Sequence, residues 1–295
     1  MSRPADISIV TVNWKVADLV GELLGSIHAN KEGLALEVYV VDNDSGDHIE
    51  DVVAKFRARS DVPVTLIRND RNLGFAKANN QAIRRCSGRY VALLNPDTRL
   101  TKGSLTRMKE WMDARPDVGI AGPKLLNPDG SLQESVRRFP RLADQALVLL
   151  KLHHLWPSAP PFKAYLAKDF DYGKEQDVDQ LMGAALFIRR KVFEGVGLLD
   201  ERFFIWFEEV DFCKRAKAGG WRVVYVPSVQ VIHHGGKSFA QAMTLKKQRY
   251  FTASMAKYFR KHRGSWTLVI LALPMLIGLL AAASLSLWNS VRAKR

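Results

Sequence analysis

The chain has 295 residues, of which 47% are hydrophobic, so it can bury one large α/β domain and leave residues for an appendage. The formal net charge of +14 could suit nucleic acid, but no nucleic-acid-binding motif occurs, and the basic cluster at residues 246–263 abuts an apolar segment. We therefore expect no nucleic-acid partner. Cys86 and Cys213 form no metal-ligand pair, which indicates reduced packing residues in the cytosol. Rossmann dehydrogenases and P-loop enzymes are disfavoured, because neither a G-x-G-x-x-G after the first strand nor a Walker A loop is present.

The amino-terminal part of the chain alternates between short apolar runs and helical patterns. This alternation implies an α/β fold with a doubly wound, mostly parallel sheet and helices on both faces. The predicted strands cover residues 6–13, 37–42, 62–67 and 90–94, and the predicted helices between them cover residues 17–30, 47–59 and 75–86.

Each of these strands ends in a polar side chain or is followed by one. These side chains are Asn13, Asp42, Asn72 and Asp97. Before Asp97, Pro96 cannot continue a strand, so the chain turns there and presents the aspartate at the strand's carboxyl end. Ligands of open α/β sheets bind at this edge. Singly, these side chains could be helix caps or turn residues, but four in succession favour a polar crevice of nucleotide size.

Seven segments carry a resemblance to a known family. In order along the chain, they resemble glycosyltransferase family 2, whose members are inverting enzymes with a GT-A fold, and most of all its bacterial rhamnosyltransferase branch. The resemblance covers residues 6 to about 240. The segments are Val-Thr-Val-Asn (10–13), Val-Asp-Asn-Asp-Ser (41–45), the asparagine-rich run 69–80, Leu-Leu-Asn-Pro-Asp-Thr (93–98), Met-Gly-Ala-Ala (182–185), Trp-Phe-Glu-Glu-Val-Asp-Phe-Cys (206–213) and Val-Ile-His-His-Gly-Gly-Lys-Ser (231–238).

The resemblance implies a binding site for a nucleotide diphosphate sugar, with a dTDP- or UDP-sugar as the donor. Asp42 would hydrogen-bond the edge of the thymine or uracil base, and Asn13 and Asn72 would line the same pocket. The other residues that the resemblance assigns to the donor are Gly74, Asn79 and Asn95.

A divalent cation, Mg²⁺ or Mn²⁺, is the cofactor that the resemblance implies. Asp97, helped by Asn95, would bind it against the two phosphates, as suits the preference of hard cations for oxygen ligands. His233 would be a further ligand, because it ends a predicted strand, residues 229–232, at the same sheet edge. The alternative for His233 is a histidine that caps a loop at the strand end.

Three acids, Glu208, Glu209 and Asp211, open a predicted helix that ends at Gly219-Gly220. They could simply cap this helix, whose positive end favours acids. By resemblance, the general base takes the second place of a Glu-Asp pair, which is Glu209 here. Because glutamate is longer than aspartate, Glu208 or Asp211 could take part instead.

The departure from Glu-Asp leaves a second hypothesis, an inactive nucleotide-sugar-binding scaffold of a glycan-assembly complex. A soluble nucleotidyltransferase on a similar sheet is disfavoured, because no glycine-rich phosphate loop lies near residue 15. For an active enzyme, the resemblance implies rhamnose as the sugar and a polyprenyl-linked or polysaccharide acceptor.

The carboxyl end predicts membrane attachment. Residues 266–288 contain no Asp, Glu, Lys or Arg, which is typical of a transmembrane helix rather than a core helix. Residues 244–263 form a basic amphipathic pattern that suits an anionic inner leaflet or, alternatively, the surface of the catalytic domain. We expect a single-pass protein of the cytoplasmic (inner) membrane, with its catalytic domain in the cytoplasm and membrane lipids as partners.

The sequence thus predicts four parts and one irregular excursion. Residues 135–177 lack a regular pattern and are predicted to be a flexible excursion over the active site, with a second membrane contact as a further option. The four parts are a catalytic domain at residues 1–240, a basic juxtamembrane helix at 241–265, a transmembrane helix at 266–288 and a short basic tail at 289–295.

Overall fold

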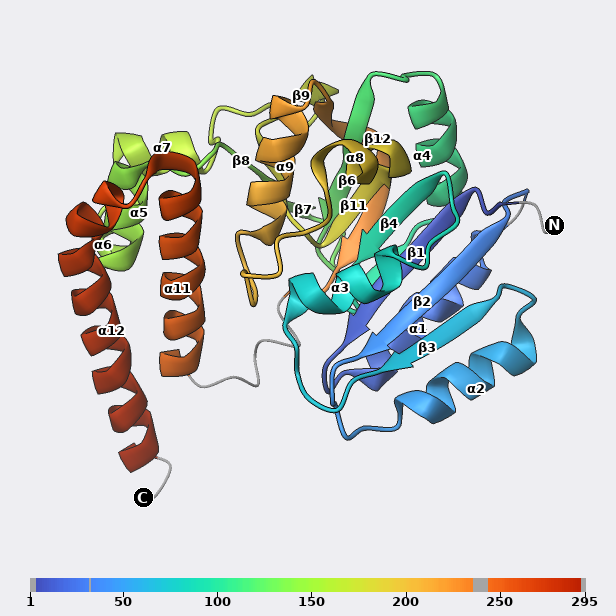
Figure 1. The fold of residues 1–295 in the computed structure, drawn as a ribbon, viewed down its shortest axis with the longest axis horizontal. Coiled ribbons are helices and arrows are strands. Elements are labelled where there is room, and N and C mark those ends of the chain that lie inside the picture. Colours follow the sequence, from blue (N-terminus) through green and yellow to red (C-terminus); the bar gives the residue numbers. More distant parts are fainter. Residues whose placement is uncertain (1–3, 32, 236–243, 293–295) are drawn as a thin grey trace.

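The computed structural model describes residues 4–31, 33–235 and 244–292, and it confirms the predicted α/β alternation (Figure 1). The third helix ends at Ile83, earlier than expected, and the third strand begins only after Pro63. The amino-terminal elements are β1 (Ile7–Asn13), α1 (Ala17–His28), β2 (Leu36–Asp42), α2 (Ile49–Arg59), β3 (Val64–Arg68), α3 (Phe75–Ile83) and β4 (Tyr90–Leu94).

The central sheet runs in the order β3-β2-β1-β4-β11-β6-β12-β5, with β7 beside β6 and β9 beside β12. Strands β1 to β4 pair in parallel, and so do β6 and β12, whereas β11 and β5 run antiparallel to their neighbours. The predicted mostly parallel sheet is therefore confirmed. The later strands are β5 (Thr98–Leu100), β6 (Val118–Leu126), β7 (Leu132–Gln133), β9 (Gln176–Asp177), β11 (Ala185–Arg189) and β12 (Arg222–His233).

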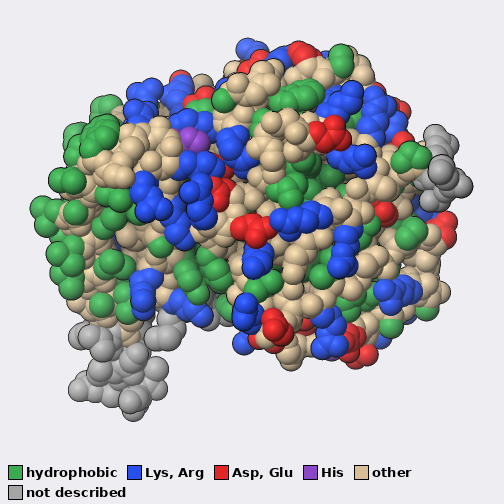
Figure 2. Space-filling model, in the orientation of Figure 1, with side chains coloured by type: hydrophobic (Ala, Val, Ile, Leu, Met, Phe, Trp, Pro, Cys, Tyr) green, Lys and Arg blue, Asp and Glu red, His purple; other side chains and the backbone are tan. Residues whose placement is uncertain are grey.

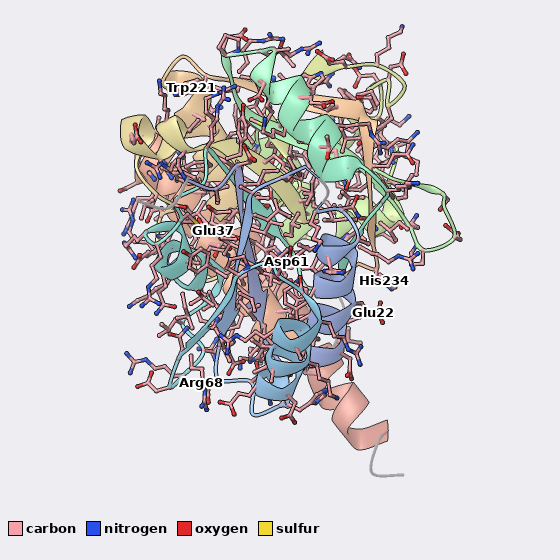
Figure 3. The ribbon with its side chains drawn as sticks, turned by 90° about the vertical axis from the view of Figure 1, so that its right-hand side faces the viewer. Glu22, Glu37, Asp61, Arg68, Trp221 and His234 are labelled. Carbon is pink, nitrogen blue, oxygen red and sulfur yellow. The ribbon has the colours of Figure 1, made fainter. Side chains whose placement is uncertain are left out.

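Alternating side chains of the strands pack into two cores, one on each face of the sheet. Ile7 and Ile9 of β1 face the core under α1, α2 and α4 (Ser104–Asp113), whereas Val10 and Val12 face the core under α3, α8 (Arg190–Val196) and α9 (Glu208–Ala218). A view from the side shows α1 and α2 covering the strands, with charged side chains such as Glu22 and Arg68 on the outside (Figure 3). The strand ends are thus held between two packed layers of helices.

The segment 135–177, predicted to be irregular, contains regular structure, so that prediction is partly wrong. Its helices are short, and they are stabilised by packing that the sequence pattern does not reveal: Leu149 is fully buried in a third core together with Phe203, Phe207 and Leu271. The elements are β8 (Val136–Arg137), which pairs with β10 (Gln180–Leu181), and the helices α5 (Leu142–Leu149), α6 (Leu152–Leu155) and α7 (Pro160–Tyr165).

The chain ends in two long helices, α11 (Thr244–Arg263) and α12 (Trp266–Arg292), which lie side by side (Figure 1). The apolar side chains of α11, among them Met255, Tyr258 and Phe259, are buried in the third core. This is the alternative arrangement for α11, in which its apolar face covers protein rather than lipid.

Helix α12 is long and apolar enough over Trp266–Ser286 to cross a membrane, by length and composition. It packs against both α11 and α5, and its opposite face leaves large apolar side chains such as Val269 and Leu273 exposed. Figure 2 shows hydrophobic side chains gathered at the left edge of the molecule, over α12. The last residues of the predicted tail, 293–295, and the end of the predicted motif at 236–238 lie outside the described residues.

Candidate active site

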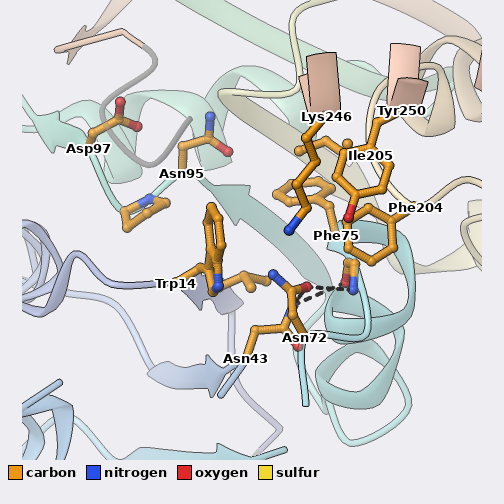
Figure 4. A pocket seen from close by; sticks show the side chains of 13 residues that line it. Trp14, Asn43, Asn72, Phe75, Asn95, Asp97, Phe204, Ile205, Lys246 and Tyr250 are labelled. Atoms are coloured by element: carbon orange, nitrogen blue, oxygen red, sulfur yellow. Dashed lines mark hydrogen bonds between the residues drawn. The ribbon is translucent and has the colours of Figure 1, made fainter. Parts of the chain in front are cut away.

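A pocket opens at the carboxyl ends of β1 and β4, the sheet edge at which the sequence predicts a nucleotide crevice (Figure 4). Four of the predicted site residues line it, namely Asn72, Gly74, Asn95 and Asp97. The other predicted site residues are not among its lining residues: Asn13, Asp42, Asn79, Glu208, Glu209, Asp211 and His233. The lining residues are Val12, Trp14, Asn43, Asn72, Gly74, Phe75, Asn95, Pro96, Asp97, Phe204, Ile205, Lys246 and Tyr250.

Asn13 and Asp42 lie behind the pocket wall and hold each other in place. The register of β1 and β2 sets Asn13 opposite Asp42. The Asn13 amide donates to Asp42 Oδ1 and to Ser45 Oγ, each at 3.0 Å, and it also reaches Asp47. Because Asn13 is fully buried, its role in the structure is to order the end of β2. Asn79 is buried as well, and it donates to the backbone oxygen of Phe75 at 2.8 Å.

Asn43 organises one side of the pocket, although the sequence analysis did not single it out. Its Nδ2 donates to Asn72 Oδ1 at 3.0 Å, and its Oδ1 accepts from the backbone N–H of Leu73 at 3.1 Å. Asn72 Oδ1 also accepts from the backbone N–H of Gly74 at 2.9 Å. Gly74 has a φ of 84°, and a Cβ there would lie 2.5 Å from the carbonyl oxygen of Phe204. Only glycine therefore fits this turn without moving the pocket wall.

Asp97 and His233 lie close together, as predicted from their positions at the ends of two strands. His233 pairs with Thr98 in the β12–β5 register, which sets His233 Nε2 at 3.3 Å from Asp97 Oδ1. Both side chains are buried. His233 Nδ1 lies 2.6 Å from Gln133 Oε1, so the two ring nitrogens face a glutamine amide on one side and the Asp97 carboxylate on the other.

This arrangement fits a divalent cation. Nε2 of His233 has no hydrogen-bond partner among the described residues, and it lies beside a buried carboxylate, so an imidazole nitrogen and carboxylate oxygens, both usual metal ligands, stand within reach of one ion. The described residues contain no group of three or more His, Cys, Asp or Glu side chains that could hold a metal. Asp97 and His233 could therefore supply only part of a coordination shell, as is usual for Mg²⁺, which keeps waters and phosphate oxygens as ligands.

Glu208 and Glu209 form the first turn of α9. Burial and the charge of Glu209 raise the pKa of Glu208, and burial raises the pKa of Glu209 to about 7. Each has a carboxylate oxygen without a hydrogen-bond partner in the described part of the chain. The preceding residues, Trp206 and Phe207, have φ values of 63° and 69°, a conformation that costs on the order of 1–3 kcal/mol for such side chains. A strained turn thus positions the two glutamates.

The segment before β11 connects Glu209 to the strand end that carries Asp97. Gly183 lies against Glu209, because a Cβ on this glycine would stand 3.6 Å from Glu209 Cβ. The next residue, Ala184, accepts a 2.9 Å hydrogen bond at its carbonyl oxygen from the backbone N–H of Asn95. Through Gly183 and Ala184, Glu209 therefore lies near the backbone of Asn95, at the start of the Asn95-Pro96-Asp97 turn.

Asp211, expected as a third catalytic candidate, is placed differently. Its side chain is fully buried and pairs with Arg215 at 2.8 Å, Lys261 at 2.6 Å and His262 at 2.7 Å. Burial alone would raise its pKa, but hydrogen bonds from His262 and Lys261 and the charge of Arg215 lower it. A carboxylate held by two cations and a histidine is a poor proton acceptor, and these contacts fasten α9 to α11.

Several lining residues escaped the sequence analysis. Trp14 lines the pocket and directly follows Asn13, a predicted site residue. Its position next to Asn13 was the one sign in the sequence that it could belong to the site. Phe204 and Ile205 precede the acidic motif in an irregular stretch. Lys246 and Tyr250 belong to the basic helix, whose pattern points to a surface and gives no indication of a pocket.

Comparisons with known proteins concern the family and the fold of the chain. The family model described as "Glycosyl transferase family 2" matches residues 8–173. The chain is 27% identical over 271 residues, 88% of this chain and 86% of the relative, to N-acetylglucosaminyl-diphospho-decaprenol L-rhamnosyltransferase of Mycobacterium tuberculosis. It is 25% identical over 199 residues, 66% of this chain and 59% of the relative, to dTDP-rhamnosyl transferase RfbF of Shigella flexneri.

Solved structures share the fold. The mannosyltransferase PcManGT from Pyrobaculum calidifontis in complex with GDP-Man and Mn²⁺ matches with a TM-score of 0.61 at 19% identity, over 99% of this chain and 76% of that chain. TarS 1–349 of S. aureus in complex with UDP matches with a TM-score of 0.53 at 15% identity, over 92% of this chain and 70% of that chain. At these identities, the likeness speaks for the fold alone.

Proposed function

The chain belongs to glycosyl transferase family 2 and is a glycosyltransferase that acts on a nucleotide sugar, and on this premise we propose that it transfers rhamnose, with inversion, to a lipid-linked or cell-surface glycan. The observation that carries the proposal is the half-buried Glu209, which lies near the Asn95-Pro96-Asp97 turn and whose pKa desolvation raises to about 7. This position supports the proposal, because a nucleotide sugar would lie along the same sheet edge and its acceptor needs a proton acceptor nearby.

Donor binding is assigned to the pocket and the residues behind it. Asn43, Asn72 and Gly74 line one side of the pocket, and Asp42, held by Asn13, orders the adjoining strand end. We propose a dTDP- or UDP-sugar as the donor. Asp97 and His233 would hold Mg²⁺ or Mn²⁺, which would neutralise charge on the departing diphosphate.

Glu209 is the proposed general base. Its carboxylate takes the proton of the acceptor hydroxyl while that oxygen attacks the anomeric carbon, and the bond from this carbon to the diphosphate oxygen breaks. A pKa of about 7 suits this task, because a large share of the groups is ionised near neutral pH and still basic enough to accept a proton. A single displacement with no covalent intermediate inverts the anomeric configuration.

The sugar and the acceptor are inferred from relatives. Two relatives are rhamnosyltransferases by name, and one of them acts on a diphospho-decaprenol-linked acceptor. An apolar α12 would hold this enzyme at a membrane, where polyprenyl-linked acceptors present their head groups. We propose single-pass attachment to the cytoplasmic membrane with the catalytic domain in the cytoplasm.

The test uses the purified full-length protein in detergent, with dTDP- and UDP-sugars offered in the presence and absence of Mn²⁺. We expect hydrolysis or transfer from one donor with Mn²⁺ and none in EDTA. Asp97→Ala should lose divalent-dependent binding of the nucleoside diphosphate while keeping the wild-type thermal midpoint. Full activity in EDTA or in Asp97→Ala contradicts the metal assignment. Donor binding without any turnover would instead support the inactive scaffold, the alternative that the Glu208-Glu209 pair raises.

A further inference from the structure

One wall of the pocket comes from α11, the helix that leads into the apolar α12. Lys246 and Tyr250, one turn apart on α11, both line the pocket, and Figure 4 shows the Lys246 side chain pointing into it. The Tyr250 ring stacks on the Phe204 ring with 4.5 Å between centroids and 21° between planes. Lys246 Nζ lies 5.9 Å from the centroid of the Tyr250 ring. The lysine therefore lies beside a stacked pair of aromatic rings.

Contacts along α11 fix the position of this wall. The Ser254 hydroxyl donates to the carbonyl oxygen of Ile205 at 2.8 Å, next to Phe204 in the pocket wall. Farther along α11, Lys261 pairs with Asp200 at 2.7 Å and with Asp211 at 2.6 Å. These contacts join α11 to the segment 200–211 at several points. The packing of the helix therefore sets the position of Lys246 at the pocket.

The charges of the pocket are arranged for a phosphate ester. Among its described lining residues, Asp97 and Lys246 carry the formal charges, and they stand on opposite sides (Figure 4). Within the described part of the chain, no carboxylate forms an ion pair with Lys246. A lysine ammonium is a compact cation with three donors, and it binds phosphate oxygens as a point charge.

We propose that Lys246 is a donor-site residue whose ammonium binds the diphosphate of the nucleotide sugar and stabilises the nucleoside diphosphate as it departs. The proposal rests on the proposed function. When the bond between the anomeric carbon and the diphosphate oxygen breaks, its electron pair stays on that oxygen, and the acceptor proton goes to Glu209. The leaving group then carries one more negative charge than the donor did, and Lys246 offsets part of it.

A polyprenyl diphosphate acceptor also carries two phosphates, so the chemistry of a lysine ammonium would suit the diphosphate of the donor or that of the acceptor. Lys246 is assigned to the donor because it shares its pocket with Asn43, Asn72 and Gly74, at the carboxyl ends of the parallel strands. The experiment below separates the two diphosphates.

Calorimetry with the full-length protein in detergent tests the assignment, with UDP, dTDP and farnesyl diphosphate as the probes. Lys246→Met should weaken binding of the nucleoside diphosphate by about 10- to 100-fold, the usual share of a charge-assisted hydrogen bond. Uridine or thymidine, which lack phosphates, should bind the variant and the wild type alike. Lys246→Arg should retain most of the affinity. Arg249→Met removes one positive charge from the same helix outside the pocket and should bind as the wild type does.

Each outcome decides the proposal. Wild-type affinity for the nucleoside diphosphate in Lys246→Met would overturn it, and so would an equal loss in Arg249→Met, which would indicate a general charge effect. A loss confined to farnesyl diphosphate would assign the lysine to the acceptor and also overturn it. If the wild type binds no nucleoside diphosphate at all, the proposed function fails and not merely the role of Lys246.

Discussion

Glu208 and Glu209 stand side by side in the first turn of α9, and ionising both in a buried place is costly. The raised pKa values follow from that cost. Glu209 can lose its proton near pH 7, while the neighbouring charge keeps the proton on Glu208. Two like residues are thereby given two different protonation states by their surroundings.

Replacing the proposed base should remove most of the turnover. Glu209→Gln keeps the size of the side chain but cannot accept the proton, so we expect transfer to fall by roughly 10²- to 10⁴-fold with little change in donor affinity. Wild-type transfer should rise with pH through about 7, and the variant should lack this rise. A pH series of transfer rates measures both effects.

The matched control is Glu208→Gln, which should reduce transfer less. Near-normal turnover in Glu209→Gln together with an inactive Glu208→Gln would assign the base to Glu208. Glu209→Asp restores the more usual residue of the family. A strong loss there would mean that the backbone of α9 is set for the longer side chain, since a shift of about 1 Å can cost on the order of 10²-fold.

Buried carboxyls also make the stability depend on pH. Burial raises the pKa of Asp144 to about 6 and that of Glu209 to about 7, above their values in an unfolded chain. Between pH 4.5 and 7 the folded protein therefore binds more protons than the unfolded one, and the free energy of unfolding falls as pH rises. We expect the thermal midpoint to drop from pH 5 to pH 8 and to drop less in Glu209→Gln. A midpoint that rises over this range would contradict the raised pKa values.

Site residues at the ends of strands could be predicted from the sequence. Residues that reach the pocket only through tertiary packing could not. Asp97 and His233 could be placed together because each ends a strand, and parallel strand ends share one edge. Lys246 could not, because its place in the pocket depends on how α11 docks on residues 200–211. The contacts of Asp211 could not be predicted for the same reason, since its partners Arg215, Lys261 and His262 lie on α9 and α11.

At the scale of elements, the spacing of apolar residues predicts where the longer helices lie, but it does not predict which surface each helix covers. The pattern at 244–263 predicts α11 correctly, yet it is equally consistent with a lipid surface or a protein surface. The helices α5 to α7 were missed because each is short, and α5 is held by the packing of Leu149 against α11 and α12. Local patterns weaken as elements shorten, and tertiary contacts then decide.

Truncation after Gly264 tests the role of α12. The truncated protein should move mostly to the soluble fraction and keep a weak, salt-sensitive membrane binding through the cations of α11. This binding should fade between about 50 and about 500 mM salt as the Debye length shortens. Because Leu271 is fully buried in the third core, the truncated protein should also unfold at a lower temperature.

Leu271→Ala in the full-length chain is the control. It should lower the thermal midpoint without changing the partition into membranes, which separates the packing of α12 from its attachment. Retention of the truncated protein in membranes at high salt would show that another segment, such as the exposed Leu155 and Trp156, anchors the chain.

For the whole molecule, the length and the packing of α12 constrain how it could cross a membrane. Its 27 residues would extend about 40 Å at roughly 1.5 Å per residue, compared with a hydrocarbon core of about 30 Å. In the structure α12 lies along α11, which carries seven Lys and Arg residues between 246 and 263. A spanning α12 must leave that contact, because carrying those cations to the depth of the bilayer is costly.

Labelling a single new cysteine measures the orientation. Ser290→Cys lies near the end of α12, and the native Cys86 and Cys213 are buried and should react slowly. If α12 spans the membrane, a membrane-impermeant maleimide should label Ser290→Cys in intact spheroplasts. Protection in spheroplasts with labelling in inside-out vesicles would mean that α12 lies on the cytoplasmic surface instead.

The position of Lys246 and Tyr250 also limits how the chain could be recombined. A boundary at residue 240 would separate every strand-end motif from one wall of the donor pocket, because both side chains come after it. The catalytic unit and the two carboxyl-terminal helices are thus not exchangeable modules. A chimera that joined residues 1–240 to a foreign tail would keep the strand-end motifs and lose the lysine opposite Asp97. The junction that preserves the pocket is the turn at Gly264, where α11 has already ended.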